Sequence, residues 1–550
     1  MSESNVNETA SEVNKNVETR KNFARSIREY WREYCENSSI QGFAHIAKDT
    51  VLIERLWWVV MFLLCSAGSI FMVLLILDKW VTTPVLVSFS KAEMPIHEIP
   101  FPAVTICPES KVSRTCLNYT DVLLSKMKGG THSADAQQKA YFDYMALLCR
   151  LENYLESIGG YYNSTEPQTA EKIGNEDYSE FLSKCSVVNL QEAICWWMDR
   201  PIRCEDIMVP VMTDEGLCYS FNMYDSRDIY SDENTMSYFE ERNRDLHWDP
   251  DNGYKLHKVD DVFPRPSFLS GSENSLVAVF YTRIDEVNYA CRNFALQGIR
   301  VSLHTPSNIP RPSQVFFSVG LNRFTNVAVK PSLTITSSQI RQYAPEKRFC
   351  YFGHERSLKY FRMYSQPNCN MECWTNYTIN LCGCVNFYMP RDKYTRVCNL
   401  QELQCLEEAS KSYPKMVLED RLDKPSSKDH FTKCTCLPLC SELTYSAEIS
   451  ASDLDFKNTD DLNYIENNQI LDQYHASAVR IFMKSEFFLP FQRDELYGIS
   501  DVVSGTGGVF GLFNGFSLFS IAEIIYYISV KLFENYRRHG HWAGPRTTRN

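Results

Sequence analysis

The residues best suited to handle an ion lie in one apolar stretch near the C-terminus. Residues 502–530 carry a single formal charge, Glu523, and this length suits a membrane-spanning helix. Glycines recur on one helix face at positions 507, 511 and 515, a spacing that lets helices approach closely in lipid. Gly515-Phe516-Ser517 would present a hydroxyl and backbone carbonyls at mid-membrane, where irregular backbone is tolerated only against protein or around water. The pattern predicts a pore helix; a glycine-rich packing helix is the alternative.

Two acidic residues and one serine near this motif have candidate roles. The intramembrane carboxylate of Glu523 is a candidate ion-path residue, or it could pair with the N-terminal segment of a neighbouring subunit. Asp501 could concentrate cations in an outer vestibule, or it could be the N-cap of the second span. Ser504 is the outermost small residue of the glycine stripe and is predicted to control gating. The alternative for Ser504 is a hydrogen bond back to Ser500 within its own helix.

A second apolar segment, residues 56–77, contains no charge and predicts another transmembrane helix. Lys and Arg are more frequent before this segment and after the C-terminal one than between them, so both termini are predicted to be cytoplasmic. Residues 22–36 suggest an amphipathic helix near the plasma membrane. The predicted parts are a cytoplasmic segment (1–55), a first span (56–77), an extracellular domain (78–496), a second span with pore and filter (497–531) and a cytoplasmic tail (532–550).

Cysteines dominate the composition of the region between the spans. Of 20 cysteines, all but Cys35 and Cys65 lie between Cys107 and Cys440. An even and dense set of this kind indicates disulfides in an oxidising compartment. Zinc is the alternative for the cluster from Cys369 to Cys440, but no paired C-x-x-C motif is present.

Other features limit the function classes. A net charge of −12 makes nucleic acid an unfavourable partner. His97-Glu98 and His354-Glu355 lack the second histidine of a metalloprotease helix, and no nucleotide or hydrolase motif is present. We therefore predict no enzyme, no catalytic residue, no metal site and no cofactor. Glycosylation is predicted at the sequons of Asn118, Asn163 and Asn376.

Short apolar runs between the spans predict a mixed α+β domain. Residues 276–281 and 299–303 suggest strands, and residues 481–490 suggest a strand that leads back to the membrane. Residues 464–474 are compatible with a helix. The predicted fold is an α+β membrane protein in which two transmembrane helices flank a large disulfide-rich extracellular domain.

Four motifs in this order resemble the degenerin/epithelial sodium channel superfamily over residues 40–535. They are Phe101-Pro-Ala-Val-Thr-Ile-Cys107, Gly216-Leu-Cys-Tyr-Ser-Phe-Asn222, the ten cysteines from Cys350 to Cys440, and Gly515-Phe516-Ser517. Cys436-Leu-Pro-Leu-Cys440 and Phe387-Tyr-Met-Pro-Arg391 look most like the insect pickpocket branch. The resemblance implies a homotrimer or heterotrimer of identical or related subunits in membrane lipid. Each subunit would have a hand-like domain with a palm β-sheet and a helical thumb.

Function and site residues also follow from this resemblance. It implies an amiloride-sensitive channel that conducts sodium, the permeant ion, with Gly515, Phe516 and Ser517 as selectivity filter. It also implies a sensory role and an extracellular ligand or force as stimulus. The implied disulfides are Cys350–Cys440, Cys369–Cys436, Cys373–Cys434, Cys382–Cys405, Cys384–Cys398, Cys107–Cys218 and Cys195–Cys204. Four cysteines remain without an assigned partner: Cys116, Cys149, Cys185 and Cys291.

Three positions depart from the family pattern. Gln41-Gly42 stands where the family has a cytoplasmic His-Gly gating pair, which puts the usual N-terminal contribution to gating in doubt. Phe516 is bulkier than the small residue of many relatives, and Gly505 replaces an aspartate of acid-sensing relatives. Two other functions stay open: a non-conducting accessory or receptor subunit that needs a partner, and an ATP-gated channel. The latter lacks the G-x-S filter, and the lysine cluster it needs for phosphates is not evident here.

Overall fold

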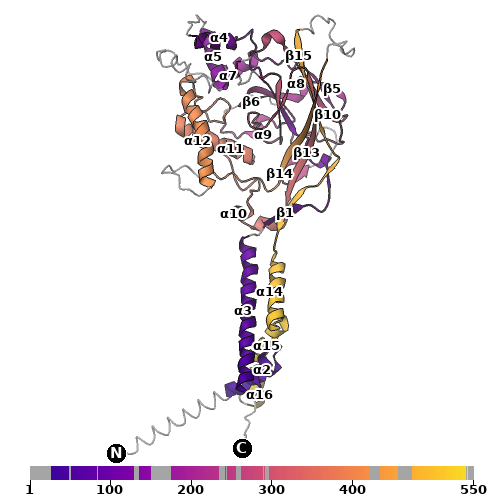
Figure 1. Ribbon diagram of the computed structural model, residues 1–550, viewed down its shortest axis with the longest axis vertical. Helices are drawn as coiled ribbons and strands as arrows, with labels where there is room; N and C mark the ends of the chain where they lie inside the picture. The colour runs from indigo at the N-terminus through magenta and orange to yellow at the C-terminus, as the bar shows by residue number, and fades with distance from the viewer. Residues whose placement is uncertain are drawn as a thin grey trace, which may run out of the picture. The chain divides into compact units, whose positions relative to one another are not determined.

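The computed structural model describes residues 26–48, 51–82, 85–128, 136–149, 175–234, 242, 244–254, 262–288, 290–291, 296–421, 434–455, 473–539 and 542. The chain divides into two compact units (Figure 1). The helical unit comprises Met1–Leu86 and Asp494–Asn550, and the cysteine-rich unit comprises Val87–Arg493.

The helical unit brings the two apolar segments of the sequence together, and α3 and α14 lie side by side in Figure 1. The helix α3 is long and apolar enough to cross a membrane, and it extends past both predicted ends of the first span because charged residues at its ends also fit a helix. A helix over residues 26–37 confirms the predicted N-terminal helix. The named helices are α2 (Phe43–Ala47), α3 (Leu52–Thr82), α14 (Ile499–Asn514), α15 (Leu518–Ile528) and α16 (Val530–His539).

The second apolar segment is broken at Gly515-Phe516-Ser517, where the sequence predicts irregular backbone. The helix α14 ends at Asn514, α15 begins at Leu518, and the two parts are bent by 74°. Gly515, between them, has a left-handed backbone with a φ of 66°, which glycine adopts at little cost. Hydropathy alone cannot show this break, because all three residues of the interruption are uncharged.

A large mixed sheet forms one layer of the cysteine-rich unit. The strand order is β1-β17-β13-β15-β10-β4-β5, and β14 pairs with β13. Side chains along β10 alternate between buried and half-buried, which matches a strand with one face in the core. The strands are β1 (Val85–Phe89), β4 (Ile194–Trp197), β5 (Arg200–Arg203), β10 (Ser275–Arg283), β13 (Arg323–Thr336), β14 (Glu442–Asp453), β15 (Tyr474–Met483) and β17 (Phe491–Glu495).

A second sheet has the order β12-β11-β3-β7-β6. All six residues of β3 are buried, so this strand lies at the centre of the core. The strands are β3 (Ala103–Pro108), β6 (Met208–Thr213), β7 (Gly216–Phe221), β11 (Ile299–His304) and β12 (Phe317–Val319). Short strands pair as β2 (Met94–Pro95) with β16 (Phe487–Phe488) and β8 (Trp248–Asp249) with β9 (Gly253–Tyr254).

The predicted strands have mixed outcomes. The strands over 276–281 and 299–303 are confirmed by β10 and β11. A single strand over 481–490 is wrong, because β15 ends at Met483 and β16 is a separate two-residue strand. Most of the helix-compatible stretch 464–474 lies outside the described residues, and Tyr474 begins β15.

Most helices of the cysteine-rich unit form two groups. The helices α11 and α12 pack side by side, and Figure 1 shows α4, α5 and α7 gathered near one another. The hydroxyl of Ser365 caps α11 by accepting a hydrogen bond from the Asn368 N–H at 3.3 Å. The helices are α4 (Tyr119–Met127), α5 (Ala136–Leu148), α7 (Asn175–Lys184), α8 (Cys204–Ile207), α9 (Ser226–Ile229), α10 (Pro345–Arg348), α11 (Gln366–Cys382) and α12 (Leu403–Arg421). The 3-10 turns are η1 (Ile96–Glu98), η2 (Ile284–Glu286), η4 (Ser338–Gln342) and η5 (Leu400–Glu402).

Disulfides join all eighteen cysteines of the cysteine-rich unit. Seven are the pairs that the family resemblance implies: Cys107–Cys218, Cys195–Cys204, Cys350–Cys440, Cys369–Cys436, Cys373–Cys434, Cys382–Cys405 and Cys384–Cys398. The four cysteines without an assigned partner form Cys116–Cys185 and Cys149–Cys291. Cys35 and Cys65, both in the helical unit, are free thiols.

Candidate functional site

The interruption of the second apolar segment is a tight turn that only glycine fits. The N–H of Gly515 donates to the Gly511 carbonyl at 2.9 Å and closes α14. A Cβ atom at position 515 would lie 2.6 Å from Cγ of Gln41, closer than any real contact. Both the positive φ and the close approach of the Gln41 side chain therefore favour a residue without a side chain.

The next two residues leave polar backbone at the break. The Phe516 ring lies edge-on to Phe510, with ring centroids 6.3 Å apart, so it packs against its own chain. Ser517 is the N-cap of α15, and its N–H donates to the Ser520 hydroxyl at 3.0 Å. The two hydroxyl oxygens of Ser517 and Ser520 are 3.5 Å apart. The break thus gathers hydroxyls and helix-terminal carbonyls within an otherwise apolar segment.

A short segment of the N-terminal part braces this turn. The N–H of Gln41 donates to the Asn514 carbonyl at 3.0 Å and so satisfies one of the last carbonyls of α14. The Asn514 side-chain amide donates to the Ser66 hydroxyl on α3 at 3.1 Å. Gly42 has a φ of 94° and begins α2, so this predicted gating glycine also has a backbone that favours glycine.

Glu523 is bound by the same N-terminal segment. Both the N–H and the hydroxyl of Ser39 donate to the Glu523 carboxylate, at 2.9 and 3.0 Å. The Ser39 hydroxyl also lies 2.7 Å from that of Ser520. This contact lies within one chain, and the alternative of a pair with the N-terminal segment of a neighbouring subunit stays a prediction.

The glycine stripe of α14 is turned away from α3. Gly505 approaches Ile76, but no atom of the described chain lies within 4 Å of a Cβ built on Gly507 or Gly508. Phe513 of α14 makes the close contact with α3. Its ring would lie 3.2 Å from a Cβ atom placed on Gly68 of α3. The small residues thus leave a smooth open face on α14 in the single chain.

Asp501 and Ser504 lie in the first turns of α14. The Asp501 carboxylate accepts a hydrogen bond from the Gly498 N–H at 3.0 Å. The N-cap residue is Gly498, so Asp501 caps the helix from its first turn and is not the N-cap itself. The exposed Ser504 hydroxyl donates to the Asp501 carbonyl at 3.3 Å, so it bonds back within its own helix as the alternative expects, but to Asp501 instead of Ser500.

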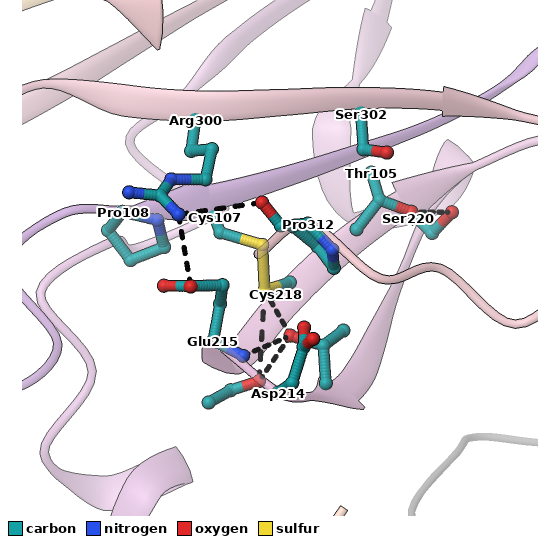
Figure 2. Close-up of a disulfide and its surroundings, with 12 residues drawn as sticks. Thr105, Cys107, Pro108, Asp214, Glu215, Cys218, Ser220, Arg300, Ser302 and Pro312 are labelled. Atoms are coloured by element: carbon teal, nitrogen blue, oxygen red, sulfur yellow. Dashed lines mark hydrogen bonds and ion pairs between the residues drawn. A yellow bond between two sulfur atoms is a disulfide. The ribbon is translucent and has the colours of Figure 1, made fainter. Parts of the chain in front are cut away.

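The sequence did not point to a buried cluster of charges beside the disulfide of Cys107 and Cys218. Arg300 lies 3.0 Å from Glu109 and 3.0 Å from Glu215, and Lys111 lies 3.0 Å from Glu215. The exposed fractions of these four side chains are 7% or less. Figure 2 shows the Arg300 guanidinium directed at the Glu215 carboxylate. The two positive and two negative charges neutralise one another, because a buried charge without an opposite charge beside it is very costly.

A half-buried histidine lies on the same sheet. His304 on β11 contacts the Thr105 hydroxyl of β3 at 2.7 Å and the Thr305 carbonyl at 3.0 Å. Burial lowers the pKa of His304 to about 4, and hydrogen bonds to backbone oppose this shift in part. The imidazole is therefore neutral near pH 7.

The predicted sequons differ in their surroundings. The amide of Asn118 donates to the Asp121 carboxylate at 2.6 Å at the start of α4. Asn376 is exposed on α11, whereas Asn163 lies outside the described residues. Glycosylation at each remains a prediction.

Comparison with protein-family models decides the relationship. The model of the amiloride-sensitive sodium channel matches residues 34–527, which include the first apolar segment, nearly all of the second and the whole cysteine-rich unit. The chain belongs to the amiloride-sensitive sodium channel family. This family is one of ion channels and not of enzymes, and membership implies a membrane channel with two membrane-crossing helices and trimeric assembly. Membership also replaces the hypothesis of an ATP-gated channel.

Curated relatives cover most of this family member. It is 28% identical to pickpocket protein 28 of Drosophila melanogaster over 514 residues, which are 90% of this chain and 78% of that protein. It is 22% identical to the sodium channel protein Nach of Drosophila melanogaster, over 94% of this chain and 90% of that protein. It is also 22% identical to acid-sensing ion channel 1A of Danio rerio, over 90% of this chain and 87% of that protein.

Proposed function

We propose that the chain is a pore-forming subunit of a trimeric, amiloride-sensitive and sodium-selective channel of the plasma membrane. In this proposal both termini are cytoplasmic, the cysteine-rich unit is extracellular, and an extracellular stimulus opens the channel. The names of two relatives, a sodium channel protein and an acid-sensing ion channel, support conduction of this kind. The observation that carries the proposal is the braced break at Gly515, Phe516 and Ser517.

The chemistry of the break suits a partly dehydrated cation. Three copies of a turn with carbonyl and hydroxyl oxygens would form a ring that replaces water around sodium. The packing of the Phe516 ring on Phe510 supports a path lined by backbone and Ser517 instead of by an aromatic side chain. In this proposal the bulky Phe516 can be the middle residue of the filter because its ring packs away from the ion path.

The open stripe on α14 supports assembly of the second spans around an axis. A Cβ atom placed on Gly507 or Gly508 would meet open space among the described residues, and small residues favour close helix contacts in lipid. Ser504 lies one turn before Gly508, on the same exposed side. We therefore assign Ser504 to the closed-state contact between subunits.

The N-terminal segment is the proposed link between the cytoplasmic end and the filter. Through Gln41 it holds the end of α14, and through Ser39 it holds Glu523 of α15. A displacement of this segment would release one carbonyl and one carboxylate at the ion path. Because Gln41 has no titratable group where the family has histidine, this contact should not respond to pH near neutrality.

Voltage-clamp recording of Ser517 variants tests the proposal. The chain is expressed alone and with related subunits, in sodium and then in a large impermeant cation. Ser517→Cys and Ser517→Asp should shift the reversal potential between sodium and potassium, because they change the ring that replaces water. Ser529→Cys, at the other end of α15, is the control and should leave it unchanged.

Two results would contradict the proposal. Unchanged reversal potentials in conducting Ser517 variants would place the filter elsewhere. If current requires a partner subunit and its reversal potential is the same in every Ser517 variant, the chain is a non-conducting accessory subunit.

A further inference from the structure

The cysteine-rich unit contains a partly open cavity of about 770 Å³ that the proposed ion path does not use. It lies between α12, the loop at 311–314 and the segment 386–389. This volume falls within the range of ordinary small-molecule sites. We propose that the cavity binds an uncharged amphipathic small molecule that carries a hydrogen-bond donor.

The body of the ligand follows from the apolar wall. Trp374 and Tyr413 form one side, with ring centroids 4.9 Å apart, and the buried side chains of Tyr388 and Met389 form another. Leu406 on α12 is 7% exposed and completes the floor. Such a surface favours an aromatic or branched aliphatic group.

The ligand should be uncharged because of the way the two charged residues of the cavity wall are paired. Arg311 lies 3.5 Å from the fully buried carboxylate of Asp214. Glu407 is paired with Lys411, one turn further along α12. Since each charge already has an opposite charge beside it, an ionic ligand would lose hydration without gaining an unopposed partner.

The hydrogen-bond donor follows from a proline inside α12. Pro414 has no N–H, so the carbonyl of Ser410, four residues earlier, lacks its helical donor. Both residues line the cavity, and a ligand N–H or O–H can take the place of the missing donor. A bound molecule would also set the distance between α12 and the 311–314 loop, and in this way it could bias the channel.

Photolabelling tests the site directly. Intact cells that express the full chain are labelled with a phenyldiazirine bearing a benzyl alcohol, and in parallel with its benzoate and benzyltrimethylammonium analogues. Labelled peptides are then mapped by mass spectrometry. The neutral alcohol should label residues of α12 and 386–389, and the two charged analogues should fail to label them.

Filling variants establish the place of binding. Leu406→Trp and Ser410→Trp should abolish this labelling, because each would occupy the cavity. Gln404→Trp, on an exposed part of α12 that does not line the cavity, should retain it. Ser410 is exposed, so its variant provides the test even if the buried Leu406→Trp fails to reach the surface.

The outcomes are separate from those for conduction. Absence of labelling in the unmodified chain, equal labelling by a charged analogue, or labelling that survives Ser410→Trp would each overturn the site. The inference rests on the proposed function only for the extracellular access of the probe. If the neutral alcohol labels the cavity but the chain carries no sodium current, the binding site is supported. Only the proposed role as a channel subunit is then refuted.

Discussion

Polar groups are held in opposite ways in the two units of this chain. In the cysteine-rich unit, Arg300, Glu109, Glu215 and Lys111 are buried full charges beside a disulfide. In the helical unit, the break is held by single hydrogen bonds from backbone, amide and hydroxyl groups, and only Glu523 is charged. Several of these contacts are partly exposed in the single chain.

The difference separates a rigid part from a part that can rearrange. A buried charge that loses its partner is costly, so the first arrangement resists any local change. A single hydrogen bond contributes about 0.5–1.5 kcal/mol, because water or another group can replace the partner. The proposed filter region can therefore exchange contacts, whereas the core of the cysteine-rich unit cannot.

The largest effect is expected from Arg300→Met. It removes the cation that lies beside Glu109 and beside one oxygen of Glu215, and breaking a buried ion pair in this way typically costs about 3–5 kcal/mol. We expect a large loss of surface delivery and of thermal stability of the purified trimer. The double variant Arg300→Met with Glu109→Gln should recover part of the loss, and failure to recover would contradict a role through charge. The control Arg203→Met removes an exposed ion pair and should be nearly neutral.

Removal of one disulfide should rank next. Cys373→Ser and Cys434→Ser should each destabilise the domain by about 2–5 kcal/mol, since both lose the same bond. The double variant should be little worse than either single variant. Surface biotinylation and non-reducing peptide mapping measure this, and a linkage of Cys373 to another cysteine would refute the pairing.

In the helical unit, Gly515→Ala should impair the channel more than folding. The left-handed backbone costs alanine about 1–2 kcal/mol, and its Cβ would collide with Gln41. Adding Gln41→Ala removes the collision but not the backbone cost, so current should recover in part. A double variant as silent as Gly515→Ala would show that Gln41 is not what limits this position. Gly507→Ala, which meets open space, is the matched control for stability of the single chain.

Ser504→Phe should open the channel rather than unfold it. If three copies of residue 504 meet near the axis of the closed trimer, the larger side chain overpacks that contact at a cost of about 1–3 kcal/mol per site. Because this cost destabilises the closed state, the population shifts toward the open state. We expect a persistent amiloride-blocked sodium current without stimulus, whereas Ser504→Ala should stay quiet. Silent Ser504→Phe channels at the cell surface would refute a closed-state contact at this residue.

The smallest effect near neutral pH concerns His304. Its pKa falls from 6.5 to about 4 on folding, so the folded chain favours the neutral imidazole. The resulting stability is fully present above pH 6.5 and is lost as pH falls from 6.5 towards 4. We expect His304→Gln to lose less thermal stability between pH 6.5 and 4 than the unmodified chain does. Above pH 7, the thermal stability of both chains should change with pH in the same way. Parallel pH profiles would contradict the assignment.

Much of the architecture could be predicted from local patterns. The two apolar segments, the cysteine density and several strands are properties of consecutive residues, so hydropathy and spacing report them. The family motifs also led to seven disulfide pairs that the structure contains. The partners of Cys116 and Cys149 could not be assigned, because no local pattern relates them to Cys185 and Cys291.

The amino-acid sequence by itself determined where the chain is apolar, where glycine permits a left-handed backbone, and which residues could supply oxygen atoms at one level of the second span. Only the tertiary structure decided that α14 ends at Asn514 and α15 begins at Leu518, and that Gln41 of the N-terminal segment contacts the break. It also decided that Arg300 reaches Glu109, which follows β3, and Glu215, which lies in the turn between β6 and β7. The physical reason is that a pattern of consecutive residues encodes burial and backbone preference, whereas the partner of a polar group depends on which distant segments meet.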